Sequence, residues 1–169
     1  MDRSPKSVLE IGCGPGLLTK ALMSKAALWV ASDYVPRFVA RVRGTPRLCA
    51  DMRRLPFRDG AFDRILVSSV LQYIARDEIG PALRELRRVV KIGGRAFVSG
   101  NPDESKLPWF IVKRKTARAS IKKSLMATWT LPEELLAFAR HTGWKAEIRR
   151  INPSVWQSGY MFDLLLVAA

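Results

Sequence analysis

A glycine-rich segment near the N-terminus has residue types that could bind a ligand through the backbone. It reads Glu-Ile-Gly-Cys-Gly-Pro-Gly over residues 10–16, where an expected strand turns into an expected helix. Glycines let the chain turn tightly and let a ligand approach the main chain, and a helix N-terminus favours polar or anionic groups. Dinucleotide-binding folds use a related loop, G-x-G-x-x-G, but Leu17 occupies its third-glycine position here. The observed spacing, E-x-G-x-G-x-G, therefore argues against a dinucleotide loop.

The elements that must position this loop alternate between short strands and helices. The expected strands are Ser7–Ile11, Leu28–Ser32, Arg47–Ala50, Phe62–Val67, Arg95–Ser99, Lys145–Ile151 and Met161–Ala168. Helices are expected from Leu17 to about Lys25, over Val35–Arg43, from Asp77 to a stop at Gly93-Gly94, and from a Thr130 N-cap to His141. This alternation predicts an α/β fold, a Rossmann-like doubly wound sheet of seven strands. Only a loop joins the sixth and seventh strands, so the last strand is expected to run antiparallel.

Taken in order, the motifs resemble those of class I S-adenosylmethionine-dependent methyltransferases. The resemblance continues from the glycine loop through an acid after the second strand, Asp33, an acid after the third, Asp51, and the segment Phe62–Ile74. It implies that Asp33 binds both ribose hydroxyls of S-adenosylmethionine and that Tyr34 lies against the adenine. It also implies that Asp51 accepts a hydrogen bond from the adenine amine and that the Met52 backbone meets the ring.

The family resemblance assigns a full set of residues to this cofactor. They are Glu10, Gly12, Gly14, Gly16, Asp33, Tyr34, Asp51, Met52 and Ser68. Asp63 is expected to be structural, and Leu55–Asp63 is similar to the subgroup that contains quinone-biosynthesis and many natural-product methyltransferases. No metal site is expected, because the single histidine, His141, cannot form a cluster with metal-ligand spacing. Cys13 and Cys49 are expected to be reduced structural thiols.

The chemistry that the resemblance implies needs little from the side chains. Methyl transfer is an in-line displacement with a neutral leaving group, so the protein chiefly holds donor and acceptor at near-attack distance. A general base is needed only when the acceptor must first lose a proton. Many relatives carry a proposed catalytic histidine where Gln72 stands here, and an amide cannot take a proton at neutral pH. His141, Tyr73 and Tyr160 are unsupported alternatives, so the catalytic residue is left unassigned.

Charge is the unusual bulk property, with 29 Lys+Arg against 15 Asp+Glu and a net charge of +14. Such a field attracts nucleic acid, anionic lipid surfaces or acidic small molecules. Ser105–Pro132 contains seven basic residues and no acid, with Trp109 and Phe110 near its start. We interpret residues 105–127 as a basic cap within a single domain of residues 1–169. The longest apolar run is about seven residues, short of the roughly 20 that span a bilayer, so a cytoplasmic protein is expected.

Three functions remain open from the sequence. The leading interpretation is methylation of a small-molecule or lipid-like acceptor; the others are RNA methylation, suggested by the charge, and a non-catalytic subunit that binds the cofactor. Relatives usually have helices before strand one, whereas about six residues precede it here, so those N-terminal helices are expected to be missing. A partner subunit, a second copy in a homo-oligomer, or the segment Ser105–Ser124 would then cover the site. The acceptor and its methylated atom are not determined by the sequence.

Overall fold

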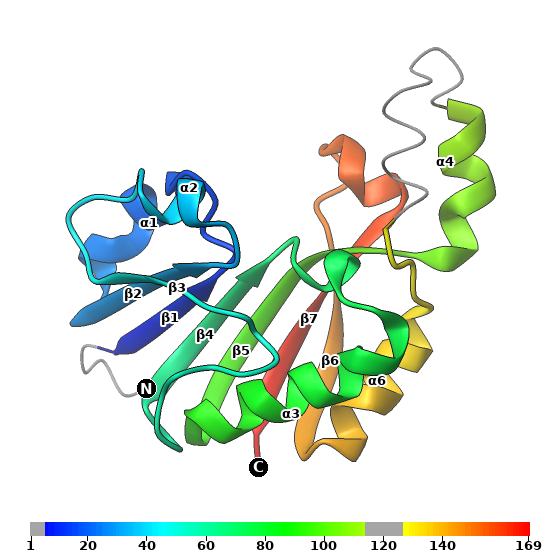
Figure 1. Cartoon of the computed structure of the whole chain (residues 1–169). Helices are drawn as coiled ribbons and strands as arrows, with labels where there is room; N and C mark the ends of the chain where they lie inside the picture. Colours follow the sequence, from blue (N-terminus) through cyan, green and yellow to red (C-terminus); the bar gives the residue numbers. More distant parts are fainter. Residues whose placement is uncertain (1–5, 114–126) are drawn as a thin grey trace.

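One mixed sheet organises the chain in the computed structural model, which describes residues 6–113 and 127–169 (Figure 1). The strands are β1 Ser7–Ile11, β2 Leu28–Asp33, β3 Arg47–Cys49, β4 Phe62–Ser68, β5 Val90–Pro102, β6 Trp144–Arg150 and β7 Met161–Ala168. Their order across the sheet is β3-β2-β1-β4-β5-β7-β6. Strand β7 runs antiparallel to both β5 and β6, while the pairs among β1 to β5 are parallel. The predicted seven-stranded sheet with an antiparallel last strand is confirmed.

Helices pack on both faces of this sheet. The α-helices are α1 Leu17–Leu22, α2 Pro36–Val39, α3 Ile79–Val89, α4 Leu107–Lys113 and α6 Pro132–His141, and the 3-10 turns are η1 Met23–Lys25, η2 Leu71–Tyr73, η3 Arg76–Glu78, η4 Glu104–Lys106 and η5 Trp156–Gly159. In Figure 1 α3 and α6 lie against β4 to β7, while α1 and α2 lie beside β1 to β3. None of the described helices is long and apolar enough to cross a membrane.

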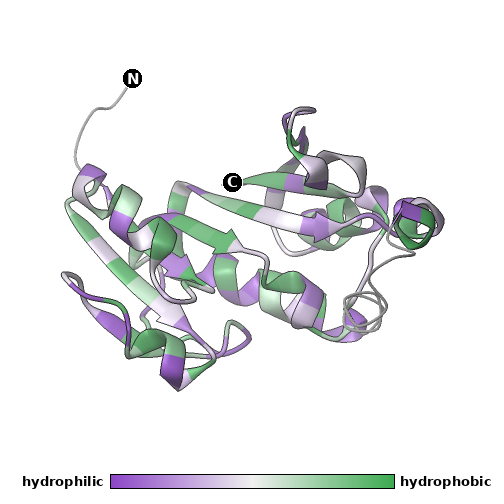
Figure 2. Ribbon diagram, turned by 90° about the horizontal axis from the view of Figure 1, so that it is seen from above, coloured by the Kyte–Doolittle hydropathy of each residue, from purple (hydrophilic) through white to green (hydrophobic). Residues whose placement is uncertain are grey.

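Alternation along the strands divides the apolar residues between two cores. In β4, Ile65 and Val67 belong to the large core with Leu83 and Leu86 of α3, whereas Leu66 packs on a smaller core from the other face. Successive strand residues point to opposite faces, so a strand buried on both sides reads as a continuous apolar run. Figure 2 shows green, apolar residues interspersed with purple, polar ones along both the strands and the helices.

The helix predicted over Val35–Arg43 is shorter in the structure, because α2 covers only Pro36–Val39 and the chain continues in turns, with Arg41 N–H donating to Phe38 and Val42 N–H to Val39. Two other predicted helix boundaries are also wrong. Helix α3 ends at Val89 instead of at Gly93-Gly94, and β5 begins directly at Val90. The register of β5 on β4 shifts between Phe62 and Arg64, so the glycine pair forms an irregularity inside β5. A Cβ atom on Gly94 would lie 2.8 Å from the Lys91 carbonyl oxygen, which explains why glycine stands there. The glycine pattern of a helix stop and that of a strand bulge are the same in sequence.

The second wrong boundary is the start of α6. Leu131 is the N-cap and makes no side-chain capping bond, while Pro132 occupies the first turn. Thr130, the predicted cap, instead forms a bridge with Asp103 and donates its backbone N–H to Pro102 at the end of β5. Pairing of this segment with β5 therefore takes precedence over the local capping preference.

Candidate functional site

The β1–α1 loop adopts a left-handed backbone at all three glycines, with φ of 77° at Gly12, 52° at Gly14 and 87° at Gly16. A Cβ atom on Gly12 would lie 2.3 Å from Val70 Cγ2, and one on Gly16 would lie 3.2 Å from Val42 Cγ2. A Cβ atom on Gly14 would meet nothing within 4 Å. Two of the glycines therefore allow the loop to pack, and the third leaves its main chain facing open space, where a ligand can approach.

Asp33 fastens this loop to the carboxyl end of β2. Its Oδ2 accepts a hydrogen bond from the Gly14 backbone N–H at 2.9 Å, and its Oδ1 accepts one from Val35 N–H at 2.8 Å. The backbone N–H groups of Gly12 and Cys13 both donate to the Ser32 carbonyl at 2.9 Å. The two predicted ligand segments therefore form one unit at the carboxyl edge of the sheet, which is where open α/β sheets bind ligands.

Glu10 lies beneath this unit, and its side chain is fully buried. Its Oε2 accepts hydrogen bonds from Thr19 Oγ1 at 2.5 Å and from Trp29 Nε1 at 2.8 Å. Among the described residues Oε1 has no hydrogen-bond partner. The carboxylate thus joins β1, α1 and β2 from inside the smaller core, so the structure places Glu10 where it supports the loop without facing solvent.

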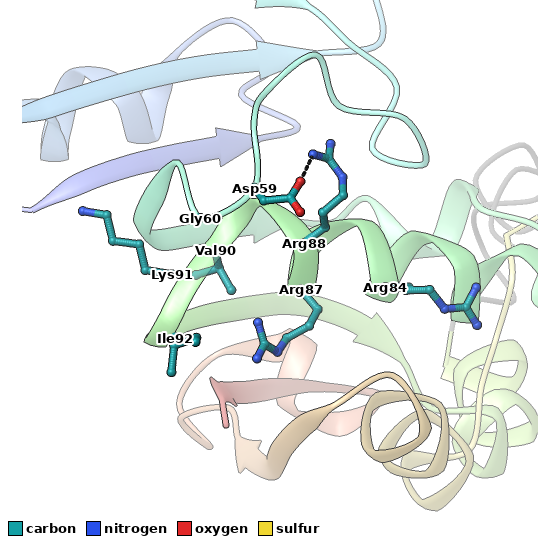
Figure 3. A pocket seen from close by; sticks show the side chains of 8 residues that line it. All are labelled: Asp59, Gly60, Arg84, Arg87, Arg88, Val90, Lys91 and Ile92. Carbon is teal, nitrogen blue, oxygen red and sulfur yellow. Dashed lines mark hydrogen bonds and ion pairs between the residues drawn. The ribbon is translucent and has the colours of Figure 1, made fainter.

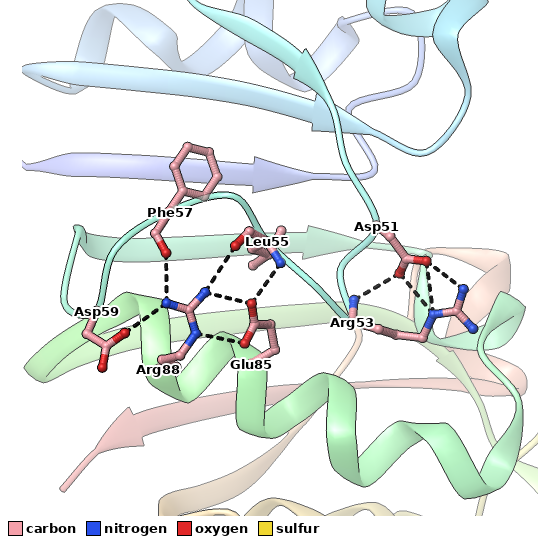
Figure 4. Close-up of polar contacts among 7 residues, drawn as sticks. All are labelled: Asp51, Arg53, Leu55, Phe57, Asp59, Glu85 and Arg88. Carbon is pink, nitrogen blue, oxygen red and sulfur yellow. Dashed lines mark hydrogen bonds and ion pairs between the residues drawn. The ribbon is translucent and has the colours of Figure 1, made fainter.

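The predicted adenine residues lie after β2 (Tyr34) and after β3 (Asp51 and Met52), in three different environments. Met52 is buried in the large core, while the Tyr34 side chain is largely exposed. Asp51 is held by the Arg53 guanidinium, whose Nε lies 2.9 Å from Oδ1 and 3.0 Å from Oδ2 (Figure 4). These bonds from Arg53 hold the pKa of the Asp51 carboxyl below its usual range. Arg53 also contacts Glu78 at 2.6 Å. Sequence reasoning missed this arginine, whose only signal is its position two residues after the acid.

The loop after β4 borders the glycine loop on its other side. The Ser68 carbonyl oxygen lies 3.0 Å from where a Cβ atom on Gly12 would stand. Ser69 has a φ of 55°, which is rare for a residue other than glycine, and its N–H donates to Ser99. Gln72 donates its amide to the Ser69 carbonyl at 3.2 Å. The predicted cofactor residue Ser68 therefore lies beside the glycine loop, in a segment whose strained backbone is typical of functional sites.

The titratable groups near this loop give one unpredicted candidate. Asp163 on β7 accepts a hydrogen bond from Gly100 N–H at 2.9 Å, and burial raises the pKa of its carboxyl. A Cβ atom on Gly100 would lie 2.5 Å from Ser69 Oγ, so this carboxyl is one backbone segment away from Ser69. The signal in the sequence is a single acid within an otherwise apolar strand. His141 Nδ1 instead contacts the Ala137 carbonyl within α6.

The other predicted groups have structural surroundings. Asp63 accepts hydrogen bonds from the backbone and hydroxyl of Ser7 and pairs with Lys91 at 2.9 Å. Burial alone would raise the pKa of Asp63, but these donors outweigh it and lower the pKa to about 2. Cys13 and Cys49 are free thiols, and burial raises the pKa of Cys13 to about 12, so its thiol stays protonated. In the part of the chain that the structure describes, no three His, Cys, Asp or Glu side chains could hold a metal.

One arginine holds the segment Leu55–Asp63, whose sequence is similar to one methyltransferase subgroup. Arg88 of α3 donates to Asp59 at 2.8 Å and to the carbonyls of Phe57 and Leu55 at 2.7 and 3.0 Å (Figure 4). Glu85 completes the network, because it accepts from Arg88 at 2.7 Å and from Leu55 N–H at 2.7 Å. The Leu55–Asp59 segment is therefore pinned to α3.

An open groove of about 630 Å³ lies next to this network (Figure 3). It is lined by Asp59, Gly60, Arg84, Arg87, Arg88, Val90, Lys91 and Ile92. Gly60 precedes β4 and Val90 begins β5, so the groove lies at the amino ends of these strands. The glycine loop follows the carboxyl end of β1, at the opposite edge, and the groove is therefore separate from the candidate cofactor site.

Comparisons with known proteins identify relatives of this chain. It is 32% identical over 113 residues to a malonyl-[acyl-carrier protein] O-methyltransferase of Legionella pneumophila, covering 61% of this chain and 39% of the relative. It is 36% identical over 93 residues to a demethylmenaquinone methyltransferase of Mycolicibacterium vanbaalenii, covering 54% of this chain and 40% of the relative. The chain thus spans about two fifths of the length of these curated relatives.

A solved structure supports the fold. The complex of the Haloferax volcanii Trm112 methyltransferase activator with a putative methyltransferase matches with a TM-score of 0.78 at 18% identity, over 99% of this chain and 84% of that one. A family model described as a methyltransferase domain matches residues 9–98, which include the glycine loop and strands β2 to β4. This match spans more than half of the sequence, and the chain belongs to the methyltransferase domain family.

Proposed function

We propose that this chain binds S-adenosylmethionine at the Gly12–Gly16 loop and transfers its methyl group to a small-molecule or lipid-like acceptor. The observation that carries the proposal is the open main chain at Gly14, held by Asp33 at the carboxyl edge of the sheet. Such a cradle fits a ligand that approaches backbone closely, and family membership supports the choice of ligand. The loop spacing argues against a dinucleotide in the same place.

The predicted cofactor residues divide into two roles in this proposal. Asp33 retains lone pairs beyond the two that its backbone donors use, since an ionised carboxylate offers about four acceptor sites, and these would bind the ribose hydroxyls. Tyr34 is exposed and would cover the adenine, while Asp51 would accept from the adenine amine after Arg53 moves. Glu10 is buried, so we assign it to positioning the loop.

The remaining predicted residues would surround other parts of the bound cofactor. Gly12 and Gly16 would keep the loop compact, the Met52 backbone would meet the adenine, and Ser68 would lie beside the methionine part. When bound, the cofactor supplies an electrophilic methyl group on a positively charged sulfur. The chain would hold the acceptor in line with that methyl and exclude water from the sulfur, because solvent weakens the electrostatic effects on which the site depends.

The acceptor class is proposed from the relatives and from an aromatic cluster beside the site. The relatives are named for a quinone and for a malonyl group on a carrier protein. A small cavity of about 40 Å³ lies between Gln72 of the loop after β4 and the side chains of Phe110, Trp129 and Tyr160. A cavity of about 40 Å³ is too small for a whole acceptor, so we propose only that these aromatic rings contact a flat or apolar part of it.

We also propose that this site is completed by a covering element, because one sheet face is left partly open to solvent. On the face opposite α3, Phe97 of β5 is 37% exposed, and its neighbours Leu165 and Val167 are only partly buried. The cover would be the proposed basic cap of residues 105–127, of which 114–126 lie outside the described residues, a second copy, or a partner subunit. The activator complex of the Haloferax volcanii neighbour supports the last of these.

Calorimetry with S-adenosylhomocysteine tests the cofactor, with NAD as the matched dinucleotide control. We expect binding of the first and none of the second, and a folded sample that binds neither contradicts the proposal. Labelled S-adenosylmethionine offered with quinone and lipid extracts, metabolites and tRNA then tests the acceptor. Label in the tRNA would favour the RNA methyltransferase alternative, and cofactor binding without any transfer would favour a non-catalytic subunit.

A further inference from the structure

An exposed apolar patch extends from α4 to η5. Its members are Trp109, which is 37% exposed, Val112 at 59%, Val155 at 42% and Trp156 at 45%. Exposing this much tryptophan and valine surface to water is energetically unfavourable. Contiguous exposed apolar patches of this kind mark interaction sites. We refer to these four residues as the α4–η5 patch.

The residues of the patch are contiguous, and they pack on buried aromatic side chains. The rings of Trp109 and Trp156 have centroids 6.1 Å apart, and Val112 follows Trp109 by one helical turn. Tyr160 lies beneath both, with its ring 4.8 Å from Trp156 and 4.8 Å from the buried Phe110. The two tryptophans are therefore presented by a packed aromatic cluster and do not hang on a free loop.

The surroundings of the patch are basic. Lys106 and Lys113 lie exposed at the two ends of α4, and Arg150 is exposed at the end of β6, just before the segment that leads to η5. Neither α4 nor residues 151–159 contain an acid. The nearest acid before α4, Glu104, is already paired with Arg76 at 2.7 Å. An apolar surface with cations around it and no free acid between them complements an anionic, apolar partner.

We infer that the α4–η5 patch docks on an anionic lipid surface. Tryptophan is the side chain that membrane interfaces favour, with its ring at the level of the headgroups, and cationic side chains add attraction to anionic lipid. Exposed aliphatic side chains such as Val112 and Val155 favour lipid over RNA, because they can neither stack on a base nor bind a phosphate. Docking here would bring the cavity beside Gln72 close to a lipid-dissolved acceptor.

The inference goes beyond the proposed methyl transfer and has its own measurement. The full chain is sedimented with vesicles of phosphatidylcholine alone or with one part phosphatidylglycerol to two of phosphatidylcholine. We expect binding to the anionic vesicles only, weakened by added salt. Trp109→Ala/Trp156→Ala should weaken it at least about tenfold, since each ring buries a large apolar area. Lys106→Gln and Lys113→Gln should each weaken it about fivefold, as expected for one cation near an anionic surface.

Ile92→Ala is the matched control, because Ile92 is an exposed apolar residue in the groove at the other edge of the sheet. It should leave vesicle binding unchanged, and the circular dichroism spectrum of each variant reports whether it folds. Failure to bind anionic vesicles, or equal binding by the double tryptophan variant, would overturn the inference. So would a short RNA that binds through the same two tryptophans and displaces the vesicles.

Discussion

The Asp33 carboxylate accepts a hydrogen bond from the Gly14 backbone N–H at 2.9 Å, which joins the end of β2 to the most open point of the glycine loop. A hydrogen bond to a charged group contributes about 1.5–3 kcal/mol. We therefore expect Asp33→Ala to weaken binding of S-adenosylhomocysteine by at least about tenfold in calorimetry. Asp77→Ala, which removes an exposed acid on η3, should have no effect.

The proposed binding of the ribose hydroxyls by Asp33 can be tested separately from its hydrogen bond to the glycine loop. A deoxy analogue of S-adenosylhomocysteine, lacking one ribose hydroxyl, should bind the wild type more weakly than the parent compound. In Asp33→Ala the two compounds should bind alike, because the shared partner is gone. If the hydroxyl still matters equally in the variant, Asp33 acts on the loop alone and another group binds the ribose.

Gly14 and Gly93 allow a matched test of the open main chain. Both have positive φ, 52° and 72°, and a Cβ atom would meet nothing within 4 Å of either. Alanine should cost about 1–2 kcal/mol of unfolding free energy at each position, from backbone strain alone. Only Gly14→Ala should also weaken cofactor binding, by about tenfold or more, because its methyl group would stand where the ligand approaches. Urea unfolding and calorimetry on both variants measure this, and equal cofactor affinities would refute the assignment.

The strands of this fold were largely predictable because most of them read as short, largely apolar runs bounded by turn residues. Ser7–Ile11 and Met161–Ala168 were predicted with the bounds that the structure shows. The positions of the glycine loop and of Asp33 followed from strand ends, and the structure brings them together. These features depend on local pattern and on family motifs.

The features that escaped prediction depend on contacts between segments distant in sequence. Gly93-Gly94 fits a helix stop equally well until β5 is paired with β4, and Thr130 fits an N-cap until it is paired with the end of β5. The carboxyl of Asp163 approaches the site only because β7 inserts beside β5. The ion pair of Arg53 with Asp51 is an exception, because the two residues are close in sequence. An exposed arginine can adopt many rotamers, and the spacing alone does not predict which partner it contacts.

Arg53 should compete with the cofactor for Asp51. Its guanidinium occupies both oxygens of the carboxylate that we assign to the adenine amine. Exposed ion pairs are weak, so Arg53→Ala should strengthen binding of S-adenosylhomocysteine by about two- to fivefold. In an Asp51→Ala background the same change should have no effect, which a double-mutant cycle by calorimetry would show. Weaker binding by Arg53→Ala would mean instead that the arginine orients the acid.

Acid stability should report the environment of Asp63. Its pKa is lowered to about 2 in the folded chain, against about 3.9 for an unfolded aspartate. An acid with a depressed folded pKa stabilises the protein fully above its unfolded pKa, and this contribution is lost as the pH falls toward the folded value. The loss should therefore occur between about pH 4 and pH 2.

Asp63→Asn should lower the free energy of unfolding at pH 7 and flatten its fall between about pH 4 and pH 2. Lys91→Ala should have a smaller effect in the same direction, since Ser7 still donates to the carboxylate through its backbone and hydroxyl. Asp77→Asn serves as the control, and urea unfolding at a series of pH values measures all three. A variant Asp63→Asn whose acid dependence equals that of the wild type would show that other carboxylates govern the low-pH stability.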